Sequence, residues 1–270
     1  MELFGLEWWQ LLIILLAGFW AGTINSVVGS GTLVTFPVLV AMGYPPVTAQ
    51  ISNAIGLVAA GVSGVFGYRR ELRESRQVLP ILTCASLLGG IIGALLLILL
   101  PPTVFGYAAP ALILVALAFV IFQPRLAALV KQRKSADAIN PTIGDVPQRP
   151  IQPILWILIF AAGIYGGYFV AAQGVLLLGI LGVFLAGSLV HANAVKTWLS
   201  LAVNLIAAVS YLLFAFDRID WSAVLLIAVS SLIGGQVGAQ IGRRIPPNVL
   251  RAVIVVIGVA GLINMVWRLL

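Results

Sequence analysis

The sequence predicts an all-α polytopic membrane protein made of two inverted repeats of about five hydrophobic segments each, or about 8–10 transmembrane helices. The first observation is composition: 61% of the residues are hydrophobic, 9% are charged, and the mean hydropathy is +1.13. The second is a series of apolar runs of about 20 residues, each long enough to cross a hydrocarbon core about 30 Å thick. The third is a duplication of small residues between the two halves of the chain.

The apolar segments form two sets of five, separated by a linker. The first set spans residues 8–28, 31–43, 46–68, 78–100 and 103–123, and the second spans 152–172, 175–190, 192–216, 221–241 and 250–268. The second member of each set is short for a full crossing, so we expect a tilted half-helix or a re-entrant arm. The domains are therefore a first membrane repeat at 1–123, a linker at 124–150, and a second, inverted repeat at 151–270. Prolines and charged residues in the linker predict a flexible, solvated segment.

Small residues recur at a constant offset of 145 positions, as 163 − 18, 174 − 29 and 246 − 101 show. The register holds across roughly a hundred residues without a gap, which chance does not produce. The matching positions are Gly18 and Gly163, Gly22 and Gly167, Gly29 and Gly174, Ala49 and Ala194, Gly89 and Gly234, Gly93 and Gly238, and Pro101 and Pro246.

A glycine-rich stretch, Gly29-Ser30-Gly31-Thr32, interrupts the first apolar region, and Gly174 is the equivalent of Gly29 in the second half. Such breaks leave backbone N–H groups unpaired, which lipid tolerates only where they line a cavity or are buried in protein. Broken helices of this kind form the substrate sites of many secondary transporters. The alternative interpretation is a tight turn, or close helix packing through glycine.

Basic residues orient the two halves. Of the 15 lysines and arginines, 12 lie in residues 69–76, 125–149 and 243–251, so the positive-inside rule places these three regions in the cytoplasm. The N-terminus and the loop at 217–220 then lie outside. Equivalent segments of the halves face opposite sides, which predicts inversion about an axis in the membrane plane. If the short second segments do not cross, each half loses one crossing and the halves become parallel.

The ionisable residues exclude several functions. All eight acidic residues lie in loops or near the N-terminus, which argues against a pump with an intramembrane carboxylate. One histidine and one cysteine cannot supply a metal-ligand set, so we expect no metal, no other cofactor and no enzymatic activity. The net charge of +7 sits in loops between apolar runs, which indicates membrane topology rather than a nucleic-acid partner.

Two basic residues lie within the apolar segments, His191 and Lys196. A lysine in a bilayer is costly and is by default a functional candidate, the alternative being a side chain that snorkels to the interface. His191 is equally explained as a structural residue near a turn. Uncharged donors occupy matching positions in both halves, and two-fold symmetry would bring them to one midplane, although each alone could be a helix–helix hydrogen bond. The candidate substrate site comprises Asn25, Ser26, Gly29, Ser30, Gly31, Thr32, Gln50, Ser52, Asn53, Gln173, Gly174, His191, Asn193, Lys196, Thr197 and Asn204.

Several stretches resemble the sulfite exporter TauE/SafE family of bacterial membrane proteins. They run from Ala21 to Thr32, from Gly43 to Ala49, from Gly67 to Leu72 and from Gly234 to Pro246. The resemblance covers both halves and implies a multi-pass protein of the bacterial cytoplasmic (inner) membrane. It also implies transport of small sulfur-containing anions, such as sulfite or organosulfonates.

Three functions are compatible with these observations: a secondary transporter that works by alternating access, a passive anion channel, and a non-transporting scaffold or assembly factor. The expected partners are a small anionic substrate and the lipid bilayer. The coupling ion, a proton or sodium, the direction of transport and the oligomeric state, with a homodimer as one option, stay open.

We predict that residues 69–76, 124–150 and 243–251 are cytoplasmic, because the positive-inside rule places 12 basic residues there. Single cysteines introduced into these regions in a Cys84→Ser background are expected to react with an impermeant thiol reagent only from the cytoplasmic face. Labelling of the linker from outside would overturn the orientation, and a cytoplasmic 217–220 loop would overturn the inversion.

Overall fold

Helices make up almost all of the described chain, which in this computed structural model comprises residues 2–3, 6–137, 153–185, 189–241 and 247–269. Two short strands form an antiparallel hairpin at the N-terminus. The elements are β1 (Glu2–Leu3), β2 (Leu6–Glu7), α1 (Trp8–Val27), α2 (Thr32–Ala41), α3 (Pro46–Gly56), α4 (Val58–Gly67), α5 (Arg69–Glu74), α6 (Leu79–Leu99), α7 (Pro102–Asp137), α8 (Pro153–Tyr168), α9 (Gln173–Phe184), α10 (Leu189–Phe214), the 3₁₀ turn η1 (Phe216–Arg218), α11 (Trp221–Ile241) and α12 (Pro247–Leu269).

Seven helical stretches among the described residues are long and apolar enough to cross a membrane. They are Trp8–Val27, Pro46–Gly67, Leu79–Leu99, Pro102–Arg125, Val190–Phe214, Trp221–Gly238 and Asn248–Trp267. Three shorter apolar helices, α2, α8 and α9, complete the set. The prediction of an all-α polytopic membrane protein is confirmed, and each predicted apolar segment contains a helix, with 46–68 divided into α3 and α4 at Leu57.

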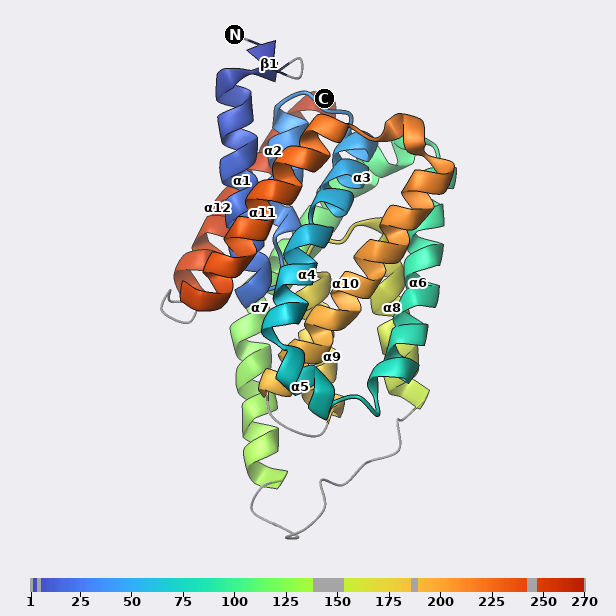
Figure 1. Cartoon of the computed structure of the whole chain (residues 1–270), viewed down its shortest axis with the longest axis vertical. Coiled ribbons are helices and arrows are strands. Elements are labelled where there is room, and N and C mark those ends of the chain that lie inside the picture. The colour runs from blue at the N-terminus through green and yellow to red at the C-terminus, as the bar shows by residue number, and fades with distance from the viewer. Residues whose placement is uncertain (1, 4–5, 138–152, 186–188, 242–246, 270) are drawn as a thin grey trace.

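The two short second segments, α2 and α9, are shorter than a helix that crosses a membrane. Helix α2 has 10 residues and α9 has 12, which at 1.5 Å per residue is only about 15–18 Å. Figure 1 shows α1 starting at the end of the molecule that holds both termini and α2 returning to that end. Helix α8 starts at the opposite end, the end that carries α5, and α9 returns there.

The pair α1–α2 and the pair α8–α9 each start and end at the same end of the molecule (Figure 1), so neither pair contributes a net crossing. Each half then has three net crossings instead of five, a loss of two and not of one. With three net crossings left in each half, the opposite orientation that the basic residues predict is retained as a prediction. The pseudo-two-fold axis stays a prediction.

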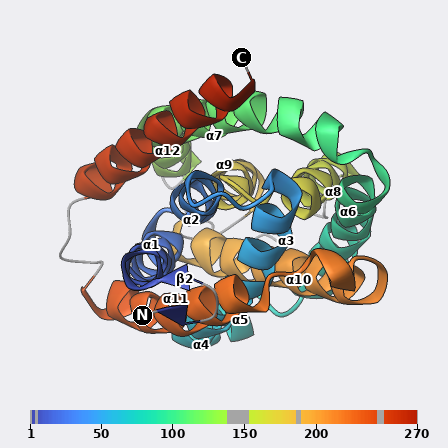
Figure 2. The same cartoon turned by 90° about the horizontal axis from the view of Figure 1, so that it is seen from above.

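The short helices are enclosed by protein. Viewed from above, α2, α3 and α9 lie inside a ring of longer helices (Figure 2). Eight of the ten residues of α2 are buried. Irregular backbone beside these helices is thus buried in protein rather than exposed to lipid, which is the condition for its stability in a membrane.

The two chain breaks differ in position. The first follows α1 and passes through Gly29 at φ +87°, as the sequence predicts. The second lies at residues 169–172, where Val170 and Ala172 have positive φ, and Gly174 is inside α9. Placing the second break at Gly174 was therefore wrong. Left-handed valine is strained, so no residue preference could mark this turn in the sequence.

The first part of the predicted linker is helical. Helix α7 continues through Pro124 to Asp137, so residues 124–137 are helical rather than flexible. The residues after Pro124 are mostly leucine, alanine, lysine, arginine and glutamine, all strong helix formers, and they outweigh one proline. The remaining linker residues, 138–150, and two predicted cytoplasmic basic residues, Arg243 and Arg244, lie outside the described residues.

Duplicated glycines join the two halves. Among the described helices, the most extensive contacts are α1 with α11 and α6 with α8, each pairing one half with the other. A Cβ atom on Gly22 would lie 2.1 Å from the carbonyl oxygen of Ser231, and one on Gly93 would lie 2.1 Å from that of Ile164. Their repeat equivalents, Gly167 and Gly238, meet backbone atoms in the same way. The small-residue faces are packing surfaces, as predicted.

We expect Gly93→Ala to destabilise the protein by about 1–3 kcal/mol, because its methyl group would collide with the backbone of α8. The measurement is thermal unfolding in detergent. Gly106→Ala in α7 is the matched control, since no atom lies within 4 Å of its Cβ position and alanine favours the helix. Equal stability of Gly93→Ala and the wild type would contradict backbone contact between α6 and α8.

Candidate functional site

Lys196 is a buried cation without a partner. It lies on α10 with 2% of its surface exposed, and its Nζ atom has no hydrogen-bond partner among the described residues. Removing an ammonium from water costs several kcal/mol when nothing compensates it. The side chain does not reach the molecular surface, which contradicts the snorkelling interpretation.

A cavity of about 20 Å³ opens beside Lys196, roughly the space of one water molecule. Its walls come from the end of α1, from α4 and from α10. The lining residues are Asn25, Ser26, Gly29, Ala60, Gly61, Gly64, Lys196, Thr197, Ser200, Leu201 and Asn204. Six residues predicted from the sequence (Asn25, Ser26, Gly29, Lys196, Thr197 and Asn204) are thereby brought together.

Gly29 makes this arrangement possible in two ways. Its φ of +87° turns the chain out of α1, a conformation that glycine adopts without strain. A Cβ atom at this position would lie 3.2 Å from Lys196 Nζ and 3.1 Å from the Cα of Gly174. The break, the cation and the equivalent glycine of the other half therefore meet at one point.

Glycines of α4 bring that helix against α10. A Cβ atom on Gly61 would lie 2.9 Å from Leu201 Cδ1, and one on Gly64 would lie 3.0 Å from Thr197 Cγ2. Neither glycine was predicted from the sequence to line the site, and Ser200 was not predicted either. The signal for Ser200 is its spacing, because Lys196, Ser200 and Asn204 lie at i, i+4 and i+8 on one helix face.

The lining polar groups divide into occupied and free ones. Ser26 Oγ faces the carbonyl oxygens of Gly22 and Gly235, each at 3.1 Å, and Thr197 Oγ1 donates to the carbonyl of Asn193 at 2.8 Å. Ser200 Oγ and Asn204 Oδ1 are buried and have no partner among the described residues. The free groups thus lie on the same helix as Lys196.

Other predicted site residues lie elsewhere. Asn53 donates to Thr32 Oγ1 at 3.3 Å and accepts a hydrogen bond from Thr35, which joins α2 to α3. Ser52 Oγ accepts from the backbone N–H of Asp220 at 2.9 Å, at the start of α11.

The rest of the predicted set is also outside the lining. Gly31 packs against the backbone of Ala21. Ser30, Gln50 and Gln173 are buried, and each has a side-chain polar atom with no hydrogen-bond partner in the part of the chain that the structure describes. The cavity therefore joins predicted residues of both halves, but none of the polar residues predicted on α3 and α9 lines it.

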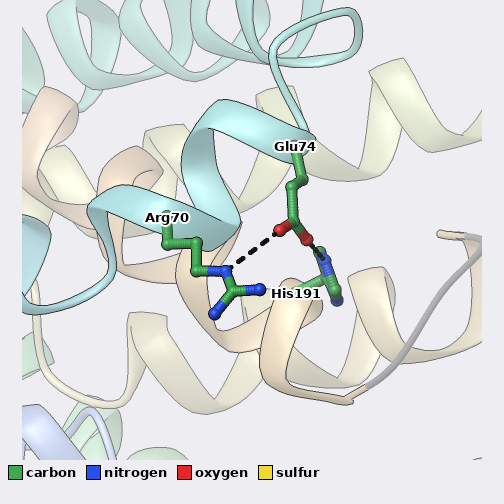
Figure 3. Close-up of polar contacts among 3 residues, drawn as sticks. All are labelled: Arg70, Glu74 and His191. Atoms are coloured by element: carbon green, nitrogen blue, oxygen red, sulfur yellow. Dashed lines mark hydrogen bonds and ion pairs between the residues drawn. The ribbon is translucent and has the colours of Figure 1, made fainter.

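His191 lies at the α5 end of the molecule rather than in the cavity. Its Nε2 is 2.6 Å from Glu74 Oε2, and Arg70 Nε is 3.5 Å from the other carboxylate oxygen (Figure 3). The hydrogen bond with His191 lowers the pKa of the Glu74 carboxyl, and the charge of Arg70 acts in the same direction. Glu74 is therefore ionised at neutral pH and ties α5 to α10.

Comparison with known proteins agrees with this architecture. The family model described as Sulfite exporter TauE/SafE matches residues 14–265. A Sinorhizobium protein named "Probable membrane transporter protein ORF9" is 27% identical over 93% of this chain and 90% of its own length. A Haemophilus influenzae "Probable membrane transporter protein" is 22% identical over 95% and 94%, and YfcA of Escherichia coli K12, with the same description, is 22% identical over 88% and 82%. No solved structure matches the chain. Since the family model covers nearly all of the sequence, the chain belongs to the sulfite exporter TauE/SafE family.

Proposed function

We propose that this protein is a secondary transporter that moves a small sulfur-containing anion, sulfite or a short sulfonate, across the bacterial cytoplasmic membrane by alternating access. The observation that carries the proposal is the buried, unpaired ammonium of Lys196 beside a cavity. The family and the printed names of its relatives, probable membrane transporters, support the transport part.

The charge of the site selects an anion. None of the residues that line the cavity is acidic. A buried cation without a counter-ion is expensive, so a ligand that supplies negative charge recovers part of the desolvation energy. A cationic or neutral solute would leave the ammonium unpaired.

The neighbouring donors favour an anion with several oxygens. Ser200 carries a free hydroxyl group one turn from Lys196, and Asn204 follows one turn later. The Asn204 side chain presents an NH₂ donor when its amide rotates. Three donors along one helix face can contact separate oxygens of one sulfite or sulfonate group. The family selects sulfur over other oxyanions that this chemistry would accept.

The small cavity supports a conformational cycle. About 20 Å³ accommodates a water molecule but not an anion with three oxygens, so the substrate must enter a wider conformation. The walls belong to different parts of the fold: α1 and α4 on one side, α10 of the second half on the other. Relative movement of these walls, in halves that we propose to be inverted copies, would open the site to one face and then the other.

Lys196→Met is expected to reduce transport by about 10- to 100-fold, which corresponds to the 1.5–3 kcal/mol of a hydrogen bond to a charged group. Lys196→Arg should also be impaired, because a planar guanidinium places its donors differently from an ammonium. The assay is initial uptake into proteoliposomes. Arg73→Met is the matched control, since it removes a positive charge from an exposed position on α5 and should retain wild-type flux. Normal flux in Lys196→Met would remove this residue from the mechanism.

The substrate class is tested with radiolabelled sulfite and a short sulfonate in the same proteoliposomes. We expect saturable uptake and counterflow, competition by similar anions, and no effect of cationic solutes, because the site has positive charge and no acid in its lining. Flux that does not saturate would indicate a channel instead. Movement of a cation or a neutral metabolite, with no flux of any sulfur anion, would overturn the anion chemistry itself.

A further inference from the structure

A hydrogen bond closes the space between α4 and α10 on one side of the cavity. Asn193 Nδ2 donates to the hydroxyl oxygen of Tyr68 at 2.7 Å. Tyr68 follows α4 directly, and its backbone N–H donates to the carbonyl of Gly64, which lines the cavity. Asn193 accepts from Thr197, another lining residue, through its carbonyl oxygen. Both partners are thus one helical turn beyond the cavity, on the same side.

That side faces the end of the molecule that carries α5. Helix α4 runs towards this end and α10 starts from it (Figure 1). Arg69, Arg70 and Arg73 lie on α5, in the region that the charge distribution predicts to be cytoplasmic. An anion moving between Lys196 and the cytoplasm along the α4–α10 interface must pass Tyr68 and Asn193.

A second contact lies further out on the same two walls. Glu74 on α5 bridges to His191, two positions before Asn193 on α10 (Figure 3). The side chain of Glu74 is 50% exposed, whereas the Tyr68–Asn193 bond is partly buried. The order from cavity to solvent is therefore a neutral inner contact followed by a charged outer contact.

The inner contact has the properties of a reversible closure. Asn193 uses one donor in it, while its Oδ1 is buried without a partner among the described residues. The contact also contains no formal charge, so opening it leaves no buried ion without a partner.

We propose that the Tyr68–Asn193 hydrogen bond is the cytoplasmic gate of the Lys196 cavity, and that Glu74–His191 forms its outer layer. The structure then represents a state that is closed towards the cytoplasm. This inference rests on the proposed function, because it takes the cavity to be the substrate site. Opening requires separation of the α4–α5 corner from the start of α10.

The test measures access to the cavity and needs no transport. Ser200→Cys in a Cys84→Ser background places a thiol in the cavity, and an impermeant anionic thiol reagent is applied to inside-out vesicles. Tyr68→Phe and Asn193→Ala each remove the bond and are expected to accelerate labelling about fivefold, which corresponds to the loss of about 1 kcal/mol. Labelling from the external face should not increase, because the loss of the bond favours the state that is open to the cytoplasm. Unchanged cytoplasmic labelling in both variants would overturn the gate.

A buried thiol elsewhere controls for general loosening of the fold. Ser86→Cys on α6 is suitable because Ser86 is 0% exposed and lies at the contact with α8, away from the gate. Its labelling should stay slow when Tyr68→Phe or Asn193→Ala is added. Acceleration at both cysteines would show a structural defect and overturn the gate. Normal flux in Lys196→Met with gate-dependent labelling of Ser200→Cys would instead refute the transport site and leave the gate intact.

Discussion

The constraint on the helices around the cavity is the ammonium of Lys196, which is buried and has no hydrogen-bond partner among the described residues. An ion in a membrane interior is stable only if its environment supplies compensation or its ligand does. Here the protein provides hydroxyl and amide groups but no acid among the residues that line the cavity. Gly29, Gly61 and Gly64 reduce the side-chain volume around the site, so that three helices approach it closely. The protein thus keeps a charge that is costly alone and favourable with an anion bound.

Glycines at helix contacts also hold the two halves of the protein together. Hydrophobic side chains gain little by leaving lipid for a protein interior, so membrane helices associate largely through close backbone packing. Gly22 on α1 and Gly93 on α6 allow contact with a helix of the other half at positions where a methyl group would not fit. The short helices α2 and α9 lie inside the ring of longer helices (Figure 2), and eight of the ten residues of α2 are buried. A chain break is tolerated in a membrane protein when packed helices keep lipid away from its backbone.

Much of the fold could be predicted from the sequence, because hydrophobic length and small-residue spacing are properties of single segments. The ten helical segments, the duplicated glycines and their packing role are of this kind. Features set by tertiary context could not be predicted in the same way. The second break at 169–172 uses Val170 and Ala172, residues with no preference for such a turn, and α7 passes through Pro124 without ending.

The candidate site shows the same division. Lys196 was predicted because a lysine in an apolar segment is costly by itself. Asn25, Ser26, Thr197 and Asn204 followed from polar character, and the structure gathers them in one cavity. Thr32, Ser52 and Asn53 look alike in sequence, yet partners on other helices occupy their polar groups. Only the fold decides whether a buried hydroxyl is already paired.

The two halves share the glycines at their helix contacts, but the cation and the free donors of the site occur in the second half without equivalents in the first. With the offset of 145, the equivalents of Lys196, Ser200 and Asn204 are Ile51, Ile55 and Ala59 (196 − 145, 200 − 145 and 204 − 145). One half therefore carries the cation and its donors, while the other presents an apolar surface at the matching positions. A single charge cannot be exposed to both sides of a membrane at once. If the protein works by alternating access, the helices around Lys196 must move relative to its side chain. The glycines of α1 and α4 carry no side chain that would obstruct this movement at their contacts.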